Sequence, residues 1–196
     1  MTAFILAGGK SSRMGSDKAF LEIKGRTLLE RALETVRSLT PEAIIVGERS
    51  KFASHGTVVE DVFRDRGPLG GIHAALAASA TDLNLVLAVD VPWMETALLK
   101  YLVKQARNTD AIVTVPKIDG GWQPLCAVYR RSFAAFAERS LLQGQNKIDA
   151  LFSTMKVFVV DENDLTRRGF SAALFRNLNT PGDFESAKRQ RTSRSQ

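Results

Sequence analysis

The chain has 196 residues, of which 44% are hydrophobic and 24% are charged, a composition typical of soluble globular proteins. This length is sufficient for one domain with a substantial core. No apolar run approaches the roughly 18–20 residues that a membrane helix needs, and no basic segment of a secretory signal precedes the first strand. The single cysteine, Cys126, excludes an internal disulfide and a cysteine-based zinc site. We therefore expect a cytoplasmic protein with no membrane partner.

The net charge of +6 is unevenly distributed along the sequence. Residues 188–196 hold four basic side chains and no acidic one, a pattern typical of solvated, disordered tails. We therefore divide the chain into a single domain, residues 1–187, and a basic, disordered tail, residues 188–196. The tail has no aromatic residue on which a nucleobase could stack, so we expect no nucleic-acid partner. A nucleic-acid-binding protein that acts through this tail is kept as an alternative.

Short apolar strands alternate with amphipathic helices along the chain. The predicted strands cover residues 4–7, 43–46, 57–59, 85–89, 111–115, 125–129 and 156–160, with a strand-like piece at 175–178. The predicted helices cover residues 28 to about 36, 72–79, 95–105, 133–142 and 147–155, and a last helix starts at Thr180. Capping boxes are expected at Thr27 with Glu30 and at Thr180 with Asp183. The alternation predicts an α/β fold of three layers, a mostly parallel sheet with helices on both faces.

The first apolar run leads into a glycine- and serine-rich loop that also contains Arg13 and Lys18. Its three glycines, Gly8, Gly9 and Gly15, disfavour a helix after the strand. Such a loop can surround phosphate, because exposed backbone N–H groups and basic side chains both favour anionic oxygens. It fits neither the P-loop motif nor the G-x-G-x-x-G dinucleotide fingerprint. A basic surface loop without function is the alternative.

Two carboxylates follow other predicted strands. Asp61 comes after strand 57–59, and Asp90 directly follows the apolar strand 85–89 and precedes Pro92. Ligands of open parallel sheets bind beyond the carboxyl ends of the strands, so these acids and the glycine loop predict a site on one edge. Asp90 is the candidate ligand of Mg²⁺, which prefers one or two carboxylates with phosphate oxygens and water. A turn- or helix-capping aspartate is the alternative.

At Leu6-Ala7-Gly8-Gly9, Arg13-Met14-Gly15 and Lys18, the chain resembles the nucleotidyltransferases that join a nucleotide to a phosphorylated acceptor. It is most similar to the molybdenum cofactor guanylyltransferase family. Related cytidylyl and sugar-nucleotide enzymes more often have alanine where Gly8 stands, which favours guanine. The resemblance implies a Rossmann-like nucleotidyltransferase fold.

Three later motifs support the same family. Asp90-Val91-Pro92 matches its Asp-x-Pro, whose aspartate binds Mg²⁺, and Gly67-Pro68-Leu69-Gly70-Gly71 matches its Gly-Pro-Leu-x-Gly. Asn179-Thr180-Pro181 matches a late Asn-Thr-Pro, although the start of a helix explains Thr180 and Pro181 without function. The resemblance runs in patches from Ala3 to about Phe184.

The resemblance implies an enzyme that transfers GMP from Mg²⁺-GTP to the phosphate of molybdopterin carrying molybdenum. The products are molybdopterin guanine dinucleotide and pyrophosphate. Molybdoenzyme apoproteins or their chaperones are candidate partners, and we expect a monomer. The alternatives are a sibling that uses CTP or a sugar-phosphate acceptor, and a non-catalytic GTP-binding module that delivers cofactor.

The resemblance also implies a role for particular residues. Arg13 and Lys18 hold phosphates and Asp90 binds Mg²⁺, and these three form the predicted catalytic set. The predicted nucleotide-binding residues are Leu6, Ala7, Gly8, Gly9, Lys18, Gly47, Asp61 and Asp90. Within that set, Leu6, Ala7 and Gly8 offer backbone groups to the guanine and ribose.

Several positions leave alternatives open. Asp61 is expected to contact the nucleoside, with Asp65 as its rival. Gly47 stands where the family often has an asparagine that touches the nucleotide, so a backbone contact would replace that side chain. Trp122, beside a turn resembling one near the family's pterin acceptor, either stacks on a flat ring or belongs to the core. The two histidines show no partner pattern and are assigned no chemistry.

Overall fold

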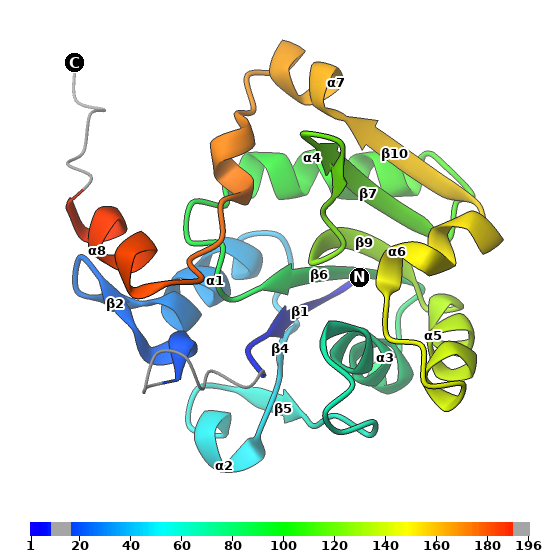
Figure 1. Cartoon of the computed structure of the whole chain (residues 1–196), viewed down its shortest axis with the longest axis horizontal. Helices are drawn as coiled ribbons and strands as arrows, with labels where there is room; N and C mark the ends of the chain where they lie inside the picture. The colour runs from blue at the N-terminus through cyan, green and yellow to red at the C-terminus, as the bar shows by residue number, and fades with distance from the viewer. Residues whose placement is uncertain (9–16, 190–196) are drawn as a thin grey trace.

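The computed structural model describes residues 1–8 and 17–189, and its centre is an eight-stranded sheet with helices around it (Figure 1). The strands are β1 (Thr2–Leu6), β2 (Glu22–Ile23), β3 (Arg26–Thr27), β4 (Ala43–Val46), β5 (Thr57–Val59), β6 (Leu83–Ala88), β7 (Val113–Ile118), β8 (Gly121–Trp122), β9 (Cys126–Arg130) and β10 (Val157–Asp161). The α-helices are α1 (Leu28–Arg37), α2 (Arg49–Phe52), α3 (Pro68–Ala78), α4 (Thr96–Arg107), α5 (Phe133–Leu142), α6 (Ile148–Leu151), α7 (Glu162–Arg167) and α8 (Pro181–Arg189). Short 3₁₀ helices cover Lys18–Phe20, Phe152–Thr154 and Ala172–Phe175.

The main sheet runs in the order β10-β7-β9-β6-β1-β4-β5, and β8 pairs with β7. The pairs β6–β1, β1–β4, β4–β5 and β7–β10 are parallel, whereas β9 lies antiparallel to both β6 and β7. Because β9 is antiparallel to both neighbours, β7 runs in the same direction as β6. The carboxyl ends of six strands therefore meet at one edge, and the predicted mostly parallel sheet is confirmed.

Alternate residues of β1 face two different cores. Ala3 and Ile5 pack in a cluster with residues of α1 and α4, whereas Phe4 and Leu6 pack in another with residues of α3 and α5. Figure 1 shows α3 and α5 together on one side of the sheet, away from α4. The predicted three layers are confirmed. No helix in the described part of the chain is long and apolar enough to cross a membrane.

Both predicted capping boxes form. The Glu30 backbone N–H donates to Thr27 Oγ1 over 3.1 Å, and the Thr27 N–H donates to Glu30 Oε2 over 2.8 Å. The Asp183 N–H donates to Thr180 Oγ1 over 3.1 Å, and Asp183 Oδ2 accepts from the Thr180 N–H over 2.9 Å. These bonds satisfy N–H groups that the first helical turn leaves without partners.

The largest departure from the prediction concerns α3, which begins at Pro68 rather than Ile72. Gly67 precedes the helix with φ +65°, and Pro68 takes the first helical position, where its missing N–H costs nothing. Gly70 is needed for close packing, because a Cβ there would lie 2.9 Å from the Phe63 carbonyl oxygen. Gly70 and Gly71, which lie before the predicted start of the helix at residue 72, are thus helical residues.

Smaller errors fall where short segments depend on tertiary contacts. Residues 175–178, predicted strand-like, form no strand, because Phe175 ends the 3₁₀ helix Ala172–Phe175 and 176–178 are irregular. The predicted helix 147–155 is split into α6 and a 3₁₀ turn, β7 extends to Ile118, and α7 was not predicted. These pieces are too short for hydrophobic periodicity to separate them.

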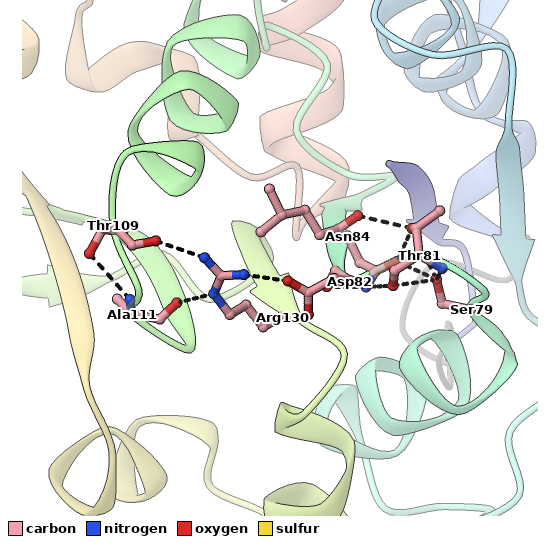
Figure 2. Close-up of polar contacts among 8 residues, drawn as sticks. Ser79, Thr81, Asp82, Asn84, Thr109, Ala111 and Arg130 are labelled. Atoms are coloured by element: carbon pink, nitrogen blue, oxygen red, sulfur yellow. Dashed lines mark hydrogen bonds and ion pairs between the residues drawn. The ribbon is translucent and has the colours of Figure 1, made fainter.

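A buried polar network around Asn84 lies at the start of β6, at the edge opposite the strand carboxyl ends (Figure 2). It reaches β1 because the Thr2 N–H donates to Thr81 Oγ1 over 3.0 Å. Asn84 is fully buried, and its Nδ2 donates to the carbonyl oxygens of Thr81 and Asp82 over 3.0 and 3.1 Å. Its Oδ1 accepts from the hydroxyls of Ser79 and Thr81. Beside it, Arg130 pairs with the Asp82 carboxylate. The network fixes the start of β6, the strand that leads to Asp90.

We expect Asn84→Ala to lower the free energy of unfolding by about 2–3 kcal/mol, because it leaves several buried polar groups without partners. Asp82→Ala is the matched control. It removes an exposed ion pair and should cost less than about 1 kcal/mol. Urea denaturation measures the loss of unfolding free energy in both variants. Equal losses would show that the buried network stabilises the protein no more than the exposed ion pair does.

Candidate functional site

The carboxyl ends of three neighbouring strands are tied together by backbone hydrogen bonds. The N–H groups of Ala7 and Gly8 both donate to the Val46 carbonyl oxygen over 3.0 Å, and the Val89 N–H donates to the Leu6 carbonyl oxygen over 3.1 Å. The end of β1 therefore lies between the ends of β4 and β6. The first residues of the predicted nucleotide loop are held at the edge of the sheet where strand-end ligands bind.

Gly8 and Gly47 pack against each other at this edge. A Cβ on Gly8 would lie 3.4 Å from the Gly47 Cα, and a Cβ on Gly47 would lie 2.7 Å from Phe52 Cε2. The Gly47 N–H donates to the Val59 carbonyl oxygen over 3.0 Å. No side chain fits at position 47 unless Phe52 moves, so only backbone is available there for a ligand.

Asp90 lies two residues beyond β6, and about a fifth of its side chain is exposed. Its Oδ2 lies 3.6 Å from the Lys18 ammonium, whereas its buried Oδ1 has no hydrogen-bond partner among the described residues. Burial raises the pKa of Asp90 above its usual range, and the neighbouring Lys18 charge opposes that rise. The carboxylate is therefore largely desolvated, and one of its oxygens is buried without a partner among the described residues.

Lys18 is held by two segments that are far apart in the sequence. Asp17 Oδ1 accepts from the Ala19 N–H over 3.2 Å and caps the short helix that carries Lys18. Lys18 Nζ also donates to Asn179 Oδ1 over 3.0 Å. The start of the last helix thus reaches the site, a role that the capping chemistry of Asn179-Thr180-Pro181 did not predict.

The chain just before Asn179 also contacts the site. The Leu178 N–H donates to the Asp90 carbonyl oxygen over 3.0 Å. Asp90 and Lys18 are therefore both bonded to residues that directly precede α8. The motif match at Asn179 was the signal in the sequence that could have indicated this contact.

Asp61 lies two residues beyond β5, at the first turn of α3, and is half-buried. A Cβ on Gly71 would lie 3.7 Å from Asp61 Oδ1 and 3.4 Å from Leu6 Cδ2, so the carboxylate sits close to the end of β1. Its Oδ1 is buried and has no hydrogen-bond partner in the described part of the chain. Burial raises the pKa of Asp61, and the charge of His73 acts in the opposite direction. Asp65, by contrast, is an exposed residue with φ +61°.

The two carboxylates share one edge of the sheet. Asp61 follows β5 and Asp90 follows β6, with β4 and β1 between them. Neighbouring strands lie about 4.8 Å apart, so three strand spacings separate the two positions by roughly 14 Å. One extended ligand can therefore reach both while it passes the backbone at Gly8 and Gly47.

Gly9 and Arg13 lie within residues 9–16, outside the described residues. Their predicted contacts with phosphate stay predictions.

A single carboxylate such as Asp90 suits a cation whose other ligands are substrate oxygens and water. Among residues 1–8 and 17–189, no three histidine, cysteine, aspartate or glutamate side chains gather into a metal-binding group. Mg²⁺ needs only one or two carboxylates when phosphate oxygens and water complete its shell. The unpartnered Oδ1 of Asp90 fits that requirement.

Trp122, in β8, lies further along the sheet and packs partly against the core. Its ring meets Phe152 edge-on at 5.1 Å between centroids, and Lys117 Nζ lies 5.0 Å from the ring centre. The residue therefore has the core contacts of a structural aromatic, while a cation lies against its ring.

Comparison with known proteins identifies the family to which the chain is similar. A family model described as the MobA-like NTP transferase domain matches residues 3–161. The molybdenum cofactor guanylyltransferase of Desulfosudis oleivorans is 33% identical over 191 residues, which cover 96% of this chain and 94% of that protein. That of Syntrophotalea carbinolica is 32% identical, with 96% and 91% covered.

Among solved structures, molybdopterin-guanine dinucleotide biosynthesis protein A from Archaeoglobus fulgidus is similar over almost its whole length. Its TM-score is 0.83 at 29% identity, with 96% of this chain and 97% of that chain covered. The matched range includes most of β1 together with Lys18, Asp61 and Asp90. The chain therefore belongs to the MobA-like NTP transferase family and is a relative of the molybdenum cofactor guanylyltransferases.

Proposed function

We propose that this chain transfers GMP from Mg²⁺-GTP to the phosphate of molybdopterin and releases pyrophosphate. The names of its relatives support this activity. The observation that carries the proposal is the pairing of a largely buried Asp90 with Lys18 beside the ends of β1 and β6. A cation and a carboxylate at that point can hold the phosphates of a nucleotide and the metal that accompanies them.

The reaction requires no covalent nucleophile from the protein. An oxygen of the acceptor phosphate attacks the α-phosphorus of GTP and forms a new P–O bond. The bond from that phosphorus to the bridging oxygen breaks, and its electron pair leaves with pyrophosphate. Catalysis then depends on alignment and on stabilising the charge of the phosphate oxygens.

In this proposal each part of the site has one role. Asp90 holds Mg²⁺, which when bound neutralises charge on the phosphate oxygens. Lys18, kept in place by Asn179, contacts the triphosphate. The backbone at Leu6, Ala7, Gly8 and Gly47 accommodates the nucleoside, and Arg13 and Gly9 complete the phosphate loop.

Asp61 accounts for a preference for guanine. The N1–H and 2-amino groups of guanine are adjacent donors, and an ionised carboxylate can accept both. The corresponding edge of cytosine has a single amino donor beside two acceptors, which a carboxylate would repel. The proposal therefore assigns the base to Asp61, which lies next to the end of β1, rather than to exposed Asp65.

The alternatives are separated by one assay. The purified chain is mixed with Mg²⁺, molybdopterin and either GTP or CTP, and pyrophosphate release is followed. GTP-dependent release supports the proposal, and release with CTP alone would assign the chain to a cytidylyl sibling. GTP binding without pyrophosphate would indicate a delivery module. Partner apoproteins, a monomeric state and a cytoplasmic location stay predictions.

We predict that Asp90→Asn lowers kcat by roughly 100-fold or more at saturating Mg²⁺, because a neutral amide is a poor ligand for this metal. The control is Asp82→Asn, since Asp82 lies before the opposite end of the same strand. Steady-state pyrophosphate release measures both. Turnover of Asp90→Asn near the control would remove Asp90 from the site.

We predict that Lys18→Ala raises the KM for GTP by roughly 10-fold or more, because a charge-assisted bond to phosphate is lost. Lys104→Ala, in the last turn of α4, removes the same charge from the opposite edge of the sheet and should leave KM unchanged. Equal KM values for the two variants would contradict the assigned role of Lys18.

A further inference from the structure

The turn of residues 17–20, which carries Lys18, is attached to α2 by aromatic rings. The ring of Phe20 stacks on the ring of Phe52, with 5.5 Å between ring centroids and 28° between ring planes. Its centroid also lies 5.5 Å from that of the His55 imidazole. Phe52 is buried, whereas 37% of Phe20 is exposed. A partly exposed aromatic ring therefore joins the Lys18 turn to α2 and to the residues that follow it.

An ion pair joins the same two segments. Asp17 Oδ2 lies 3.5 Å from the Lys51 ammonium, which also donates to Glu48 Oε1 over 2.6 Å. The other oxygen of Asp17 accepts from the Ala19 N–H and caps the turn. Each oxygen of this carboxylate therefore has its own partner, because Oδ1 closes the turn and Oδ2 attaches it to α2.

The position of α2 is fixed relative to the edge of the sheet where the nucleotide is proposed to bind. Its first residue, Arg49, donates through its guanidinium to the Val58 carbonyl oxygen of β5 over 3.1 Å. Phe52 packs against Gly47, where a Cβ would lie 2.7 Å from Phe52 Cε2. The ring of Phe52 therefore contacts both Phe20 and the backbone that the proposed function assigns to the nucleoside.

The backbone that carries Lys18 has little support of its own. The 3₁₀ helix Lys18–Phe20 is a single turn of three residues, and hydrogen-bond geometry in such turns is poorer than in α-helices. Ala19 is fully buried and fixes the middle of the turn, while Asn179 holds the far end of the Lys18 side chain. The contacts of Asp17 and Phe20 with α2 fix the two ends of the turn.

We propose that Phe20 and Lys51 are positioning residues, which hold the Lys18 turn against α2 and so set the distance from the Lys18 ammonium to the backbone at Gly47. This inference rests on the proposed function. A GTP molecule has to meet both of these groups at once, and a cation that is already in place loses less entropy when it binds phosphate. Phe20 and Lys51 therefore contribute to triphosphate binding through Lys18 rather than through contacts of their own.

The test compares Phe20→Ala with Phe136→Ala in the full chain. Phe136 is a part-buried aromatic residue on α5, where its ring lies 4.9 Å from the Arg139 guanidinium, so its loss matches the side chain removed from the Lys18 turn. Steady-state pyrophosphate release gives kcat and the KM for GTP. Phe20→Ala should raise KM roughly threefold or more with kcat within about twofold, whereas Phe136→Ala should change neither. Phe20→Tyr keeps the stacked ring and should restore KM.

Lys51→Ala is a second variant, which leaves the stacked rings in place and changes an exposed side chain. It should raise the KM for GTP roughly twofold or more, and Lys51→Arg should restore it, because arginine keeps the charge that pairs with Asp17. Lys188→Ala is the matched control, since Lys188 also pairs with an acid three residues earlier, Glu185, and lies near the end of α8. It should leave KM unchanged.

Two measurements separate positioning from a general loss of structure. Titration calorimetry with inorganic tripolyphosphate should show weaker binding to Phe20→Ala and Lys51→Ala, whereas the binding of guanosine should not change. In a Lys18→Ala background, Phe20→Ala should raise KM no further, because the side chain that it positions is absent. A rise in KM that persists in full in that background would show that Phe20 does not act through Lys18.

The outcomes separate the two proposals. If the unaltered chain releases no pyrophosphate from GTP, the proposed function fails. If it is active, and Phe20→Ala and Lys51→Ala both match their controls in KM and in tripolyphosphate binding, only the positioning role fails. Should Phe20→Ala not fold, the Lys51 variants decide the question.

Discussion

The site depends on one electrostatic constraint, which is the removal of a carboxylate from water beside a single lysine. Asp90 keeps its charge at a cost, because burial disfavours the ionised form and one of its oxygens has no partner among the described residues. Lys18 offsets part of that cost, and Asn179 fixes the position of Lys18. A cation that reaches the unpartnered oxygen of Asp90 would offset this cost. Desolvation of the carboxylate therefore favours the binding of a metal ion together with its nucleotide.

The sheet places Asp90 at one end of a binding surface that is formed by the carboxyl ends of several strands. Parallel pairing brings the ends of β5, β4, β1 and β6 to one edge, and close packing of Gly8 on Gly47 keeps bare backbone in the middle of it. Asp61 at one side resembles Asp90 at the other, because each has a buried Oδ1 without a hydrogen-bond partner among the described residues. The arrangement suits a ligand with donors at one end and negative charge at the other, which describes guanine and its triphosphate.

Much of this could be predicted from the sequence, because a carboxylate directly after an apolar strand must lie at the carboxyl end of that strand, where ligands of such sheets bind. Asp90 was assigned to the correct edge for that reason, Gly8 at the end of β1 lies at the same edge, and Thr27 and Thr180 carried capping signals. The start of α3 was missed because glycine indicates a loop, whereas Gly70 serves close packing within a helix. The contact of Asn179 with Lys18 was not predicted, although Asn179 belongs to a matched motif, because the two residues lie far apart in the sequence.

The most direct measurement is a crystal structure of the protein with GTP and Mg²⁺. The account predicts Mg²⁺ about 2.1 Å from Asp90 Oδ1, Lys18 on the triphosphate, and the guanine edge against Asp61. A nucleotide that lies along the edge from β5 to β6 would satisfy all three contacts. A metal bound by other carboxylates, or a base that points away from Asp61 while Lys18 makes no contact with the triphosphate, would contradict it.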